Sequence, residues 1–309
     1  ALALDLQSGV LIDYYNGLQD LQAGRIRAIG SARERFCEDG LRPVRACRFS
    51  AVLGFAMDPD ILAALQDPTV RQRTAMIAVE RFSAELHKAF QIQFAGARMI
   101  QSLQTTDLIS IFWPSDCLGA YPGLDGNAMR RLASMQTTGF AQVLAYWLYL
   151  LFPAAGAVVA PIARSWKLAR QESKATEFLI EVFQIQTTLL NSTEPKKAAP
   201  SAESLIAIKD WLARIKQHYH EQAGSFLKAI WWPPGTQELR ELCHTVLASE
   251  PLTIADLQIQ GTQLQEYGLR GAQIGACLRC LQKQVWLHPE FNYPEQLAQL
   301  IEQCKQDQI

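Results

Sequence analysis

The stretch RERFCEDGLRPVRACRFSAVLGF, residues 33–55, decides how the chain folds around its most polar surface. Asp39, Arg42, Arg45 and Arg48 stand at three-residue steps. On one helix such steps place side chains along a single face, so the spacing predicts an acid and three bases in one row. The apolar residues between them keep helical spacing and are expected in a core. They are Phe36, Leu41, Val44, Cys47, Ala51, Val52 and Phe55.

An acid next to an arginine on a rigid helix can recognise the edge of a nucleotide base. Adenine and cytosine each present an exocyclic amino donor beside a ring-nitrogen acceptor, and guanine and uracil present the opposite pattern. A carboxylate accepts from the amino group while a guanidinium donates to the ring nitrogen. Asp39 and Arg42 together could therefore select both adenine and cytosine without a nucleic-acid template. The alternative is a solvated helix pair, worth a few tenths of a kcal/mol.

The neighbouring motifs favour the first interpretation, because together they resemble one enzyme family. Glu38, Asp39, Arg42, Arg45, Arg48 and Phe49 resemble the E-D-x-x-R helix of the class II tRNA nucleotidyltransferases (CCA-adding enzymes) and bacterial poly(A) polymerases. Upstream, the family's D-L pair and R-x-I-R-x-x-G segment are matched by Asp13, Gly17, Asp20, Leu21, Arg25, Arg27 and Gly30. Downstream, Glu80, Arg81, Glu85 and Leu86 resemble E-R-I-x-x-E-L, with Phe82 in place of Ile. Residues 107–114 and the C-terminal stretch 251–292 resemble later landmarks of the family, so the landmarks follow the family order along nearly all of the chain.

The resemblance implies a nucleotidyltransferase of the template-independent RNA polymerase type, with ATP, CTP and tRNA as substrates. It implies that Asp39 and Arg42 pair with the incoming base and that Arg45 and Arg48 support that pair or the phosphates. Glu38 is expected to orient the helix that reads the base. The remaining motif residues are expected to brace the junction of palm and neck: Asp13, Asp20, Glu80, Arg81 and Glu85. Two alternatives remain, a poly(A) polymerase and a catalytically silent tRNA-binding module.

The catalytic metal ligands of this family have no counterpart in the 309 residues. The family holds two Mg²⁺ ions with a D-x-D pair on strands of its palm, and no such pair stands in a strand context here. Asp58-Pro59-Asp60 has the spacing, but the proline between the acids predicts a helix cap. We therefore expect no catalytic residue and no metal site in this chain, and no activity from it alone. The palm is expected to be removed, disordered or supplied by a separate chain.

The fold class expected is mainly α: helical neck, body and tail domains following a short β remnant of a polymerase-β-like palm. Residues 1–30 are assigned to the end of the palm, 31–92 to the neck with the nucleotide-recognition helices, and 93–190 to a helical body. Residues 191–203 are rich in small, polar and proline residues and predict a linker. Residues 204–309 are assigned to a helical tail that binds tRNA.

A second basic group follows Pro161. Arg164, Lys167, Arg170 and Lys174 fall within one helical arc and are predicted to meet tRNA phosphates, without setting base choice. A solvated helix face is the alternative.

Trp231 and Trp232 in the WWPPG run could stack on RNA bases, whereas a packed loop between helices is the preferred interpretation.

Composition favours a cytoplasmic protein. The net charge is −1, but residues 25–48 carry seven arginines against three acids, which suits a triphosphate and an RNA end. The seven cysteines show no zinc spacing, and Cys277 and Cys280 are expected as buried thiols.

The uncharged run at residues 132–163 approaches the length of a membrane span. Its prolines and polar residues favour buried protein instead, with breaks expected at Pro153, Gly156 and Pro161.

Overall fold

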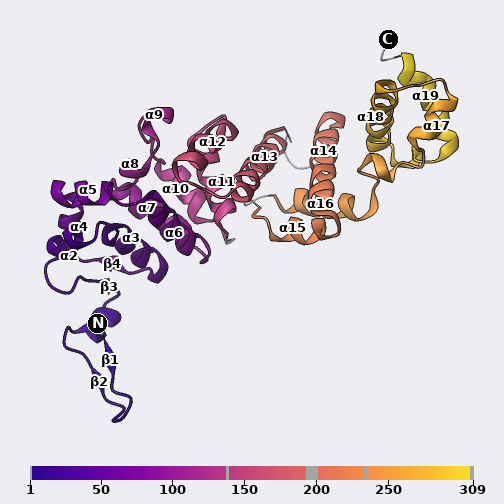
Figure 1. The fold of residues 1–309 in the computed structure, drawn as a ribbon. Helices are drawn as coiled ribbons and strands as arrows, with labels where there is room; N and C mark the ends of the chain where they lie inside the picture. The colour runs from indigo at the N-terminus through magenta and orange to yellow at the C-terminus, as the bar shows by residue number, and fades with distance from the viewer. Residues whose placement is uncertain (1, 137–138, 193–200, 233–235, 307–309) are drawn as a thin grey trace. The chain divides into compact units, whose positions relative to one another are not determined.

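The structure is a computed structural model that describes residues 2–136, 139–192, 201–232 and 236–306, leaving aside the side chains of residues 188–192, 218 and 306. It is mainly α, as predicted, with short strands near the N-terminus (Figure 1). The chain forms two compact units, Ala1–Phe183 and Gln184–Ile309, and each is described by itself.

The first unit begins with short strands whose pairing the sequence did not specify. β1 (Ala3–Leu4) and β2 (Leu11–Ile12) form an antiparallel hairpin. After α1 (Gly17–Gln22), β3 (Arg25–Ile26) pairs in parallel with β4 (Ala56–Met57). The partner of β3 thus lies well beyond the expected palm segment 1–30, because the chain returns to β3 after two intervening helices.

Helices make up the rest of this unit, and short caps define several of them. Asp58 accepts a hydrogen bond from the Asp60 N–H at the start of α4, with Pro59 in the first turn, so the predicted helix cap is confirmed. The helices are α2 (Ala32–Glu38), α3 (Arg42–Leu53), α4 (Pro59–Gln66), α5 (Pro68–Ala75), α6 (Val79–Phe90), α7 (Ala95–Thr105), α8 (Ile109–Phe112), α9 (Ser115–Leu118), α10 (Gly126–Ala133), α11 (Phe140–Leu151), α12 (Ala155–Ser165) and α13 (Arg170–Ser192).

The helix α3 is fixed from behind by its apolar face. It packs against α6 and α7, and five of the seven apolar residues predicted for the core in this stretch are buried: Phe36, Leu41, Val44, Cys47 and Ala51. Val52 and Phe55 are only partly buried. This packing holds the polar face of α3 in a fixed position at the surface.

An aromatic core joins α6 to the later helices of the first unit. The rings of Phe82 and Phe112 stack at 4.0 Å. The Trp166 indole donates to the Phe112 carbonyl at 2.8 Å, and the Ser83 hydroxyl donates to the Trp166 carbonyl at 2.7 Å. The uncharged run at residues 132–163 contributes buried residues of α11 and α12 to this unit, while other described residues of the run, among them Pro153 and Gly156, are exposed. The run breaks at Pro153, between α11 and α12, as expected, but Gly156 and Pro161 lie inside α12 and do not end it.

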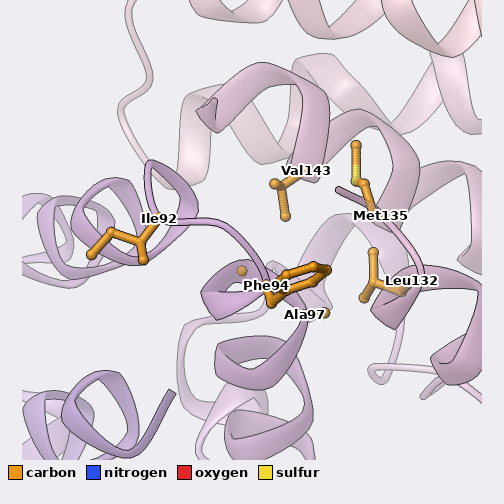
Figure 2. A pocket seen from close by; sticks show the side chains of 7 residues that line it. Ile92, Phe94, Ala97, Leu132, Met135 and Val143 are labelled. Carbon is orange, nitrogen blue, oxygen red and sulfur yellow. The ribbon is translucent and has the colours of Figure 1, made fainter. Parts of the chain in front are cut away.

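Figure 2 shows a small apolar cavity where α7, α10 and α11 approach one another, with Phe94, Leu132 and Val143 directed into it. Its volume is about 10 Å³, roughly the space of one water molecule. Gly96 lines it, and a Cβ on that residue would lie 2.8 Å from Val143 Cγ1. Glycine therefore permits the close approach of α7 to α11, and the cavity is a packing void too small for a substrate.

The second unit contains α14 (Ala202–Tyr219), η1 (His220–Gln222), α15 (Ala223–Ala229), α16 (Gln237–Ser249), η2 (Ile254–Asp256), α17 (Gly261–Glu266), α18 (Ala272–Leu287), η3 (Pro289–Phe291) and α19 (Pro294–Gln306). A core of leucines and isoleucines joins α17, α18 and α19. Within the predicted linker 191–203, α13 continues through Ser192 and α14 begins at Ala202, while residues 193–200 lie outside the described residues.

Two side-chain expectations in the second unit have different outcomes. Cys277 is a buried free thiol, as expected, but Cys280 is bonded to Cys304 and joins α18 to α19. Sequence spacing missed this pair because its partner comes 24 residues later on another helix. Trp231 is buried, and the Trp232 indole donates to the Leu227 carbonyl at 3.2 Å, which confirms the packed interpretation for these two residues.

Candidate functional site

The predicted acidic residue of the site lies at a corner between two helices. We expected Asp39 and the arginines on one helix, and this was wrong: α2 ends at Glu38 and α3 begins at Arg42, with Asp39 extended between them. The physical reason is Gly40, which is buried against the end of α5. A Cβ there would lie 2.3 Å from the Arg73 carbonyl oxygen, so only glycine allows this approach of the two backbones.

Asp39 is held by both of its carboxylate oxygens. Oδ1 accepts a hydrogen bond from the Leu41 N–H at 3.1 Å, and Oδ2 accepts one from Arg81 of α6 at 3.2 Å. The pKa of Asp39 lies below its ordinary value, chiefly because of the Leu41 N–H and then because of Arg81, although partial burial opposes the shift. The carboxylate is therefore ionised and oriented, and it retains lone pairs for a further donor.

Arg42 is paired with Glu38, and the predicted role of Glu38 in orienting the helix that reads the base stays a prediction. One oxygen of Glu38 accepts from Arg42 Nη1 at 2.7 Å and the other accepts from Arg35 Nη1 at 2.9 Å. Arg42 Nη1 also donates to the Arg35 carbonyl at 3.0 Å, and Arg35 Nε donates to the Ile29 carbonyl at 3.0 Å. These bonds use one end of the Arg42 fork, and neither Nε nor Nη2 has a partner among the described residues.

Beside these residues the surface forms a hollow of about 500 Å³, large enough for a nucleotide-sized ligand. Its charged lining consists of four arginines, Arg27, Arg35, Arg42 and Arg45, and no acid lines it among the described residues. Phe49 supplies an aromatic wall and is 37% exposed. The guanidinium of Arg45 lies 5.7 Å from the centre of that ring. The hollow therefore combines positive charge with a flat apolar surface, which suits a ligand that carries phosphates and a base.

Arg48 is directed elsewhere. Its Nε donates to the buried carboxylate of Glu85 on α6, and Lys88 donates to the other oxygen of Glu85 at 2.8 Å. Burial alone raises the pKa of Glu85, but the hydrogen bonds from Lys88 and Arg48 outweigh it and hold that pKa below the ordinary value. Arg48 lies outside the set of residues that line the hollow, and its guanidinium covers Phe49 at 4.2 Å.

The remaining motif residues form local contacts around this surface. The Asp13 carboxylate accepts from the N–H groups of Gly17 and Leu18 and caps α1. Asp20 accepts from Arg27 Nε at 3.0 Å and so fixes an arginine of the hollow. Glu80 pairs with Lys167, next to the Arg81–Asp39 pair. The structure thus brings Glu38, Asp39, Arg42, Arg45 and Arg81 together and gives Asp13, Asp20, Glu80 and Glu85 supporting contacts.

The second basic group does not form one helical arc, contrary to the sequence prediction. Arg164 lies in α12, Arg170 and Lys174 lie in α13, and Lys167 lies between the two helices with φ 50°. The left-handed backbone at Lys167 ends the first helix, because its continuation would need right-handed dihedral angles. All four side chains are at least partly exposed. Lys167 is committed to Glu80, so Arg164, Arg170 and Lys174 are the cations of this group without an ion pair among the described residues.

Sequence reasoning missed two of the arginines that line the hollow, Arg27 and Arg35, and gave Phe49 only a motif position. A usable signal existed for Arg27, because it belongs to the R-x-I-R-x-x-G segment. Its position in the hollow depends on the pairing of β3 with β4, which no local pattern specifies.

No group of three or more His, Cys, Asp or Glu side chains suited to a metal ion occurs among the described residues. Among the described helices none is both long and apolar enough to cross a membrane.

Comparisons with known proteins point to one family. The chain is 28% identical over 274 residues to the CCA-adding enzyme of Streptococcus sanguinis (strain SK36), covering 80% of this chain and 65% of the relative. It is 27% identical over 305 residues to the CCA-adding enzyme of Leuconostoc mesenteroides, covering 97% and 68%. The chain therefore spans about two thirds of the length of these curated relatives. No protein-family model matches it.

A solved structure matches the fold as well. The CCA-adding enzyme of Bacillus stearothermophilus, crystallised in complex with CTP, superposes with a TM-score of 0.66 at 26% sequence identity. The superposition covers 99% of this chain and 72% of that enzyme. Sequence and fold therefore agree over nearly the whole described chain.

Proposed function

We propose that this chain is a member of the family of the CCA-adding enzymes, and that it supplies nucleotide selection and tRNA binding to a tRNA nucleotidyltransferase that adds C and A to the tRNA 3′ end. The observation that carries the proposal is the corner between α2 and α3. There an ionised Asp39 and a fixed Arg42 stand beside a hollow lined by four arginines. CTP bound to the Bacillus stearothermophilus relative supports CTP as one substrate, and ATP is the second substrate that the base pattern predicts.

The proposed selection rests on hydrogen-bond polarity. Asp39 keeps acceptor capacity after bonding to Leu41 and Arg81, so it can receive the amino group of cytosine or adenine. Arg42 keeps donors at Nε and Nη2, so it can donate to the neighbouring ring nitrogen. A uracil or guanine would offer a carbonyl to Asp39 and leave two acceptors facing each other. Rejection then needs no template, because both groups are already held in place.

We propose that the other contacts bind the phosphates or hold the base-selecting residues in place. Arg45 and the arginines of the hollow meet the phosphates, while Arg48 keeps Phe49 and α3 in place through Glu85. Asp13, Asp20, Glu80, Arg81 and Glu85 brace the α1, β3 and α6 segments around the site. Arg164, Arg170 and Lys174 contact tRNA phosphates. In domain terms, residues 1–30 end a palm, 31–92 form the neck, 93–190 the body and 204–309 the tail.

The chemistry needs Mg²⁺, and we propose that the acids holding it lie outside these 309 residues. The D-x-D spacing at Asp58-Pro59-Asp60 is already used: Asp58 caps α4, and Asp60 accepts from the Ala32 N–H at 2.9 Å. The 309-residue chain alone is then expected to incorporate no nucleotide, and an assembly that contains the metal-holding residues is expected to be active in the cytoplasm. AMP or CMP addition by the isolated chain would refute this assignment.

The decisive experiment compares Asp39→Ala with a matched control in the metal-containing assembly. Asp67→Ala removes a comparable acid, because Asp67 also accepts backbone N–H hydrogen bonds and pairs with an arginine, Arg33. Single-turnover incorporation of all four nucleotides on one tRNA is measured. We expect Asp39→Ala to lose discrimination against UTP and GTP by about ten- to more than a hundredfold, since one base-reading group is worth ~1–3 kcal/mol. Asp67→Ala should leave selectivity unchanged.

Unchanged selectivity in a folded Asp39→Ala enzyme would show that base choice resides elsewhere. The product length on the same tRNA separates the alternatives that the sequence left open. Addition that stops at the CCA end supports the proposed activity, and a long A tail supports a poly(A) polymerase. Binding without any incorporation in the complete assembly supports a silent tRNA-binding module.

A further inference from the structure

The second unit contains a hollow with basic side chains in its lining that the proposed nucleotide site does not use. Its volume is about 350 Å³, and it lies where α14, η1, α15 and α16 meet. Four basic side chains line it, one from each of these elements: Lys216, His220, Lys228 and His244. Glu221 is the one acid in its lining among the described residues. The lining also contains apolar residues, among them Ala223 and Leu247.

Much of this positive charge lacks a partner. Lys216 is paired with Asp256 at 2.9 Å. Neither Lys228 nor His244 has an ion pair or a side-chain hydrogen bond among the described residues. Partial burial lowers the pKa of His244, and the nearby charges of Arg240 and Lys228 lower it further. The cations around the partly buried imidazole repel one another and disfavour its protonated form. An anion bound among them would attract each of these cations and so stabilise the cluster.

We propose that this hollow binds a phosphate group, held by Lys228, His244, Lys216 and His220. The shared chemistry is that of a phosphodiester of an RNA strand or a free phosphate, and the RNA source rests on the proposed function. Lys228 supplies three donors on a flexible stem that can follow a phosphate along a backbone. A protonated imidazole donates from both nitrogens, so His244 and His220 can each contribute a charge-assisted hydrogen bond. Glu221, the acid of the lining, disfavours a ligand that would fill the whole hollow with negative charge.

The titration of His244 gives the site a pH signature. The groups that face His244 are Lys216 from α14, His220 and Glu221 from η1, Lys228 from α15 and Arg240 of its own helix. In the free protein burial and the neighbouring cations favour the neutral imidazole. A bound phosphate favours the protonated form, so binding takes up a proton. Affinity for a phosphodiester, whose own charge does not change in this range, is therefore expected to rise as the pH falls toward and below about 6.5, the ordinary pKa of imidazole.

The test uses the full 309-residue chain and the double variant Lys228→Ala/His244→Gln. Binding of tRNA is measured as a function of salt and pH, and inorganic phosphate is titrated while the histidine side chains are followed by NMR. The matched control is Lys283→Ala/His288→Gln, which makes the same chemical change in the same unit outside the hollow. Lys228 is exposed and His244 is half-buried, so the fold should survive the test substitutions.

We expect the test variant to bind tRNA more weakly, with a salt slope lower by about 1 for one phosphate that is no longer neutralised and with a flattened pH dependence. The control should resemble the wild type. An effect on tRNA assigns the RNA source. No effect on tRNA, together with a phosphate-induced shift of His244 that vanishes in Lys228→Ala, assigns a free phosphate.

Other outcomes overturn one proposal and spare the other. If the wild type binds tRNA and neither tRNA nor phosphate senses the double variant, the phosphate site is refuted while the proposed function stands. If the control loses as much affinity as the test variant, the effect is one of general charge and the site is refuted. If the wild type binds no tRNA but phosphate still shifts His244, the tRNA function fails and the phosphate site stands.

Discussion

Two basic surfaces of the first unit differ in how their charges are held. At the α2–α3 corner, Arg42 and Arg35 share the two oxygens of Glu38, and Asp39 is fixed by Arg81 and the Leu41 N–H. Between α12 and α13, the cations Arg164, Arg170 and Lys174 are at least partly exposed and stand on two separate helices.

The difference teaches what each surface can recognise. A base edge differs from another only in the position of donors and acceptors, so it must be read by groups whose geometry is fixed before the ligand arrives. A phosphate backbone is the same at every nucleotide, so mobile cations suffice to bind it. We therefore expect changes at the corner to alter selectivity or folding, and changes at α12–α13 to alter affinity alone.

The largest effect is expected where the corner is anchored. Arg48→Ala removes one of the two cations on the buried Glu85, whose side chain is 3% exposed. Breaking a buried pair costs ~3–5 kcal/mol, and Lys88 should keep the loss near the lower end. The free energy of unfolding is measured by urea denaturation at constant m-value. Arg33→Ala breaks the exposed pair with Asp67 and should cost less than about 1 kcal/mol. Equal losses in the two variants would mean that the corner has no special anchor.

A smaller effect is expected at the second basic surface. Arg170→Glu combined with Lys174→Glu should weaken tRNA binding and lower its salt slope by roughly 1 for each phosphate that these side chains neutralise in the wild type. The preference for CTP and ATP over the other nucleotides should not change, because phosphate contacts carry no base information. Filter binding over a salt series measures the slope. Lys167→Ala serves as the control, since Lys167 is paired with Glu80 and should contribute less. A change in base preference would break the comparison between the two surfaces.

The smallest effect is expected in the stability of the protein at low pH. The pKa of Asp39 is lowered in the folded state, chiefly by the Leu41 N–H, so its carboxylate contributes stability that is present above pH ~4 and is lost as the pH falls through the folded-state pKa. Asp39→Asn removes that titration. The stability difference between wild type and variant should therefore shrink as the pH falls from about 5 to about 3. Thermal unfolding at several pH values measures it, and a difference that stays constant with pH would show that the charge of Asp39 does not stabilise the corner.

Local rules predicted a large part of this protein correctly. The cap at Asp58 follows from an acid before proline, and the buried positions of α3 follow from helical periodicity. The same rules failed at Asp39 and at Lys167. The three-residue spacing predicts a continuous helix through both positions. In the structure the helix is broken by Gly40 packed against α5 and by the left-handed backbone at Lys167. Gly40 and Pro43 are local signals for the break at Asp39, because a proline inside a helix removes a backbone hydrogen bond. The residues beside Lys167 include neither glycine nor proline, so that break has no such signal.

The sequence by itself determined which residues can carry the chemistry: the E-D-x-x-R run, the E-R-F-x-x-E-L run and their order along the chain. It also determined the mainly α fold, because periodicity and caps are local properties. Only the tertiary structure decided that Arg81 holds Asp39 and that Arg48 turns to Glu85. It also brought Arg27 and Arg35 to the same hollow as Arg42. These outcomes join residues that are distant in sequence, and burial and backbone contact between elements select them, which no local pattern encodes.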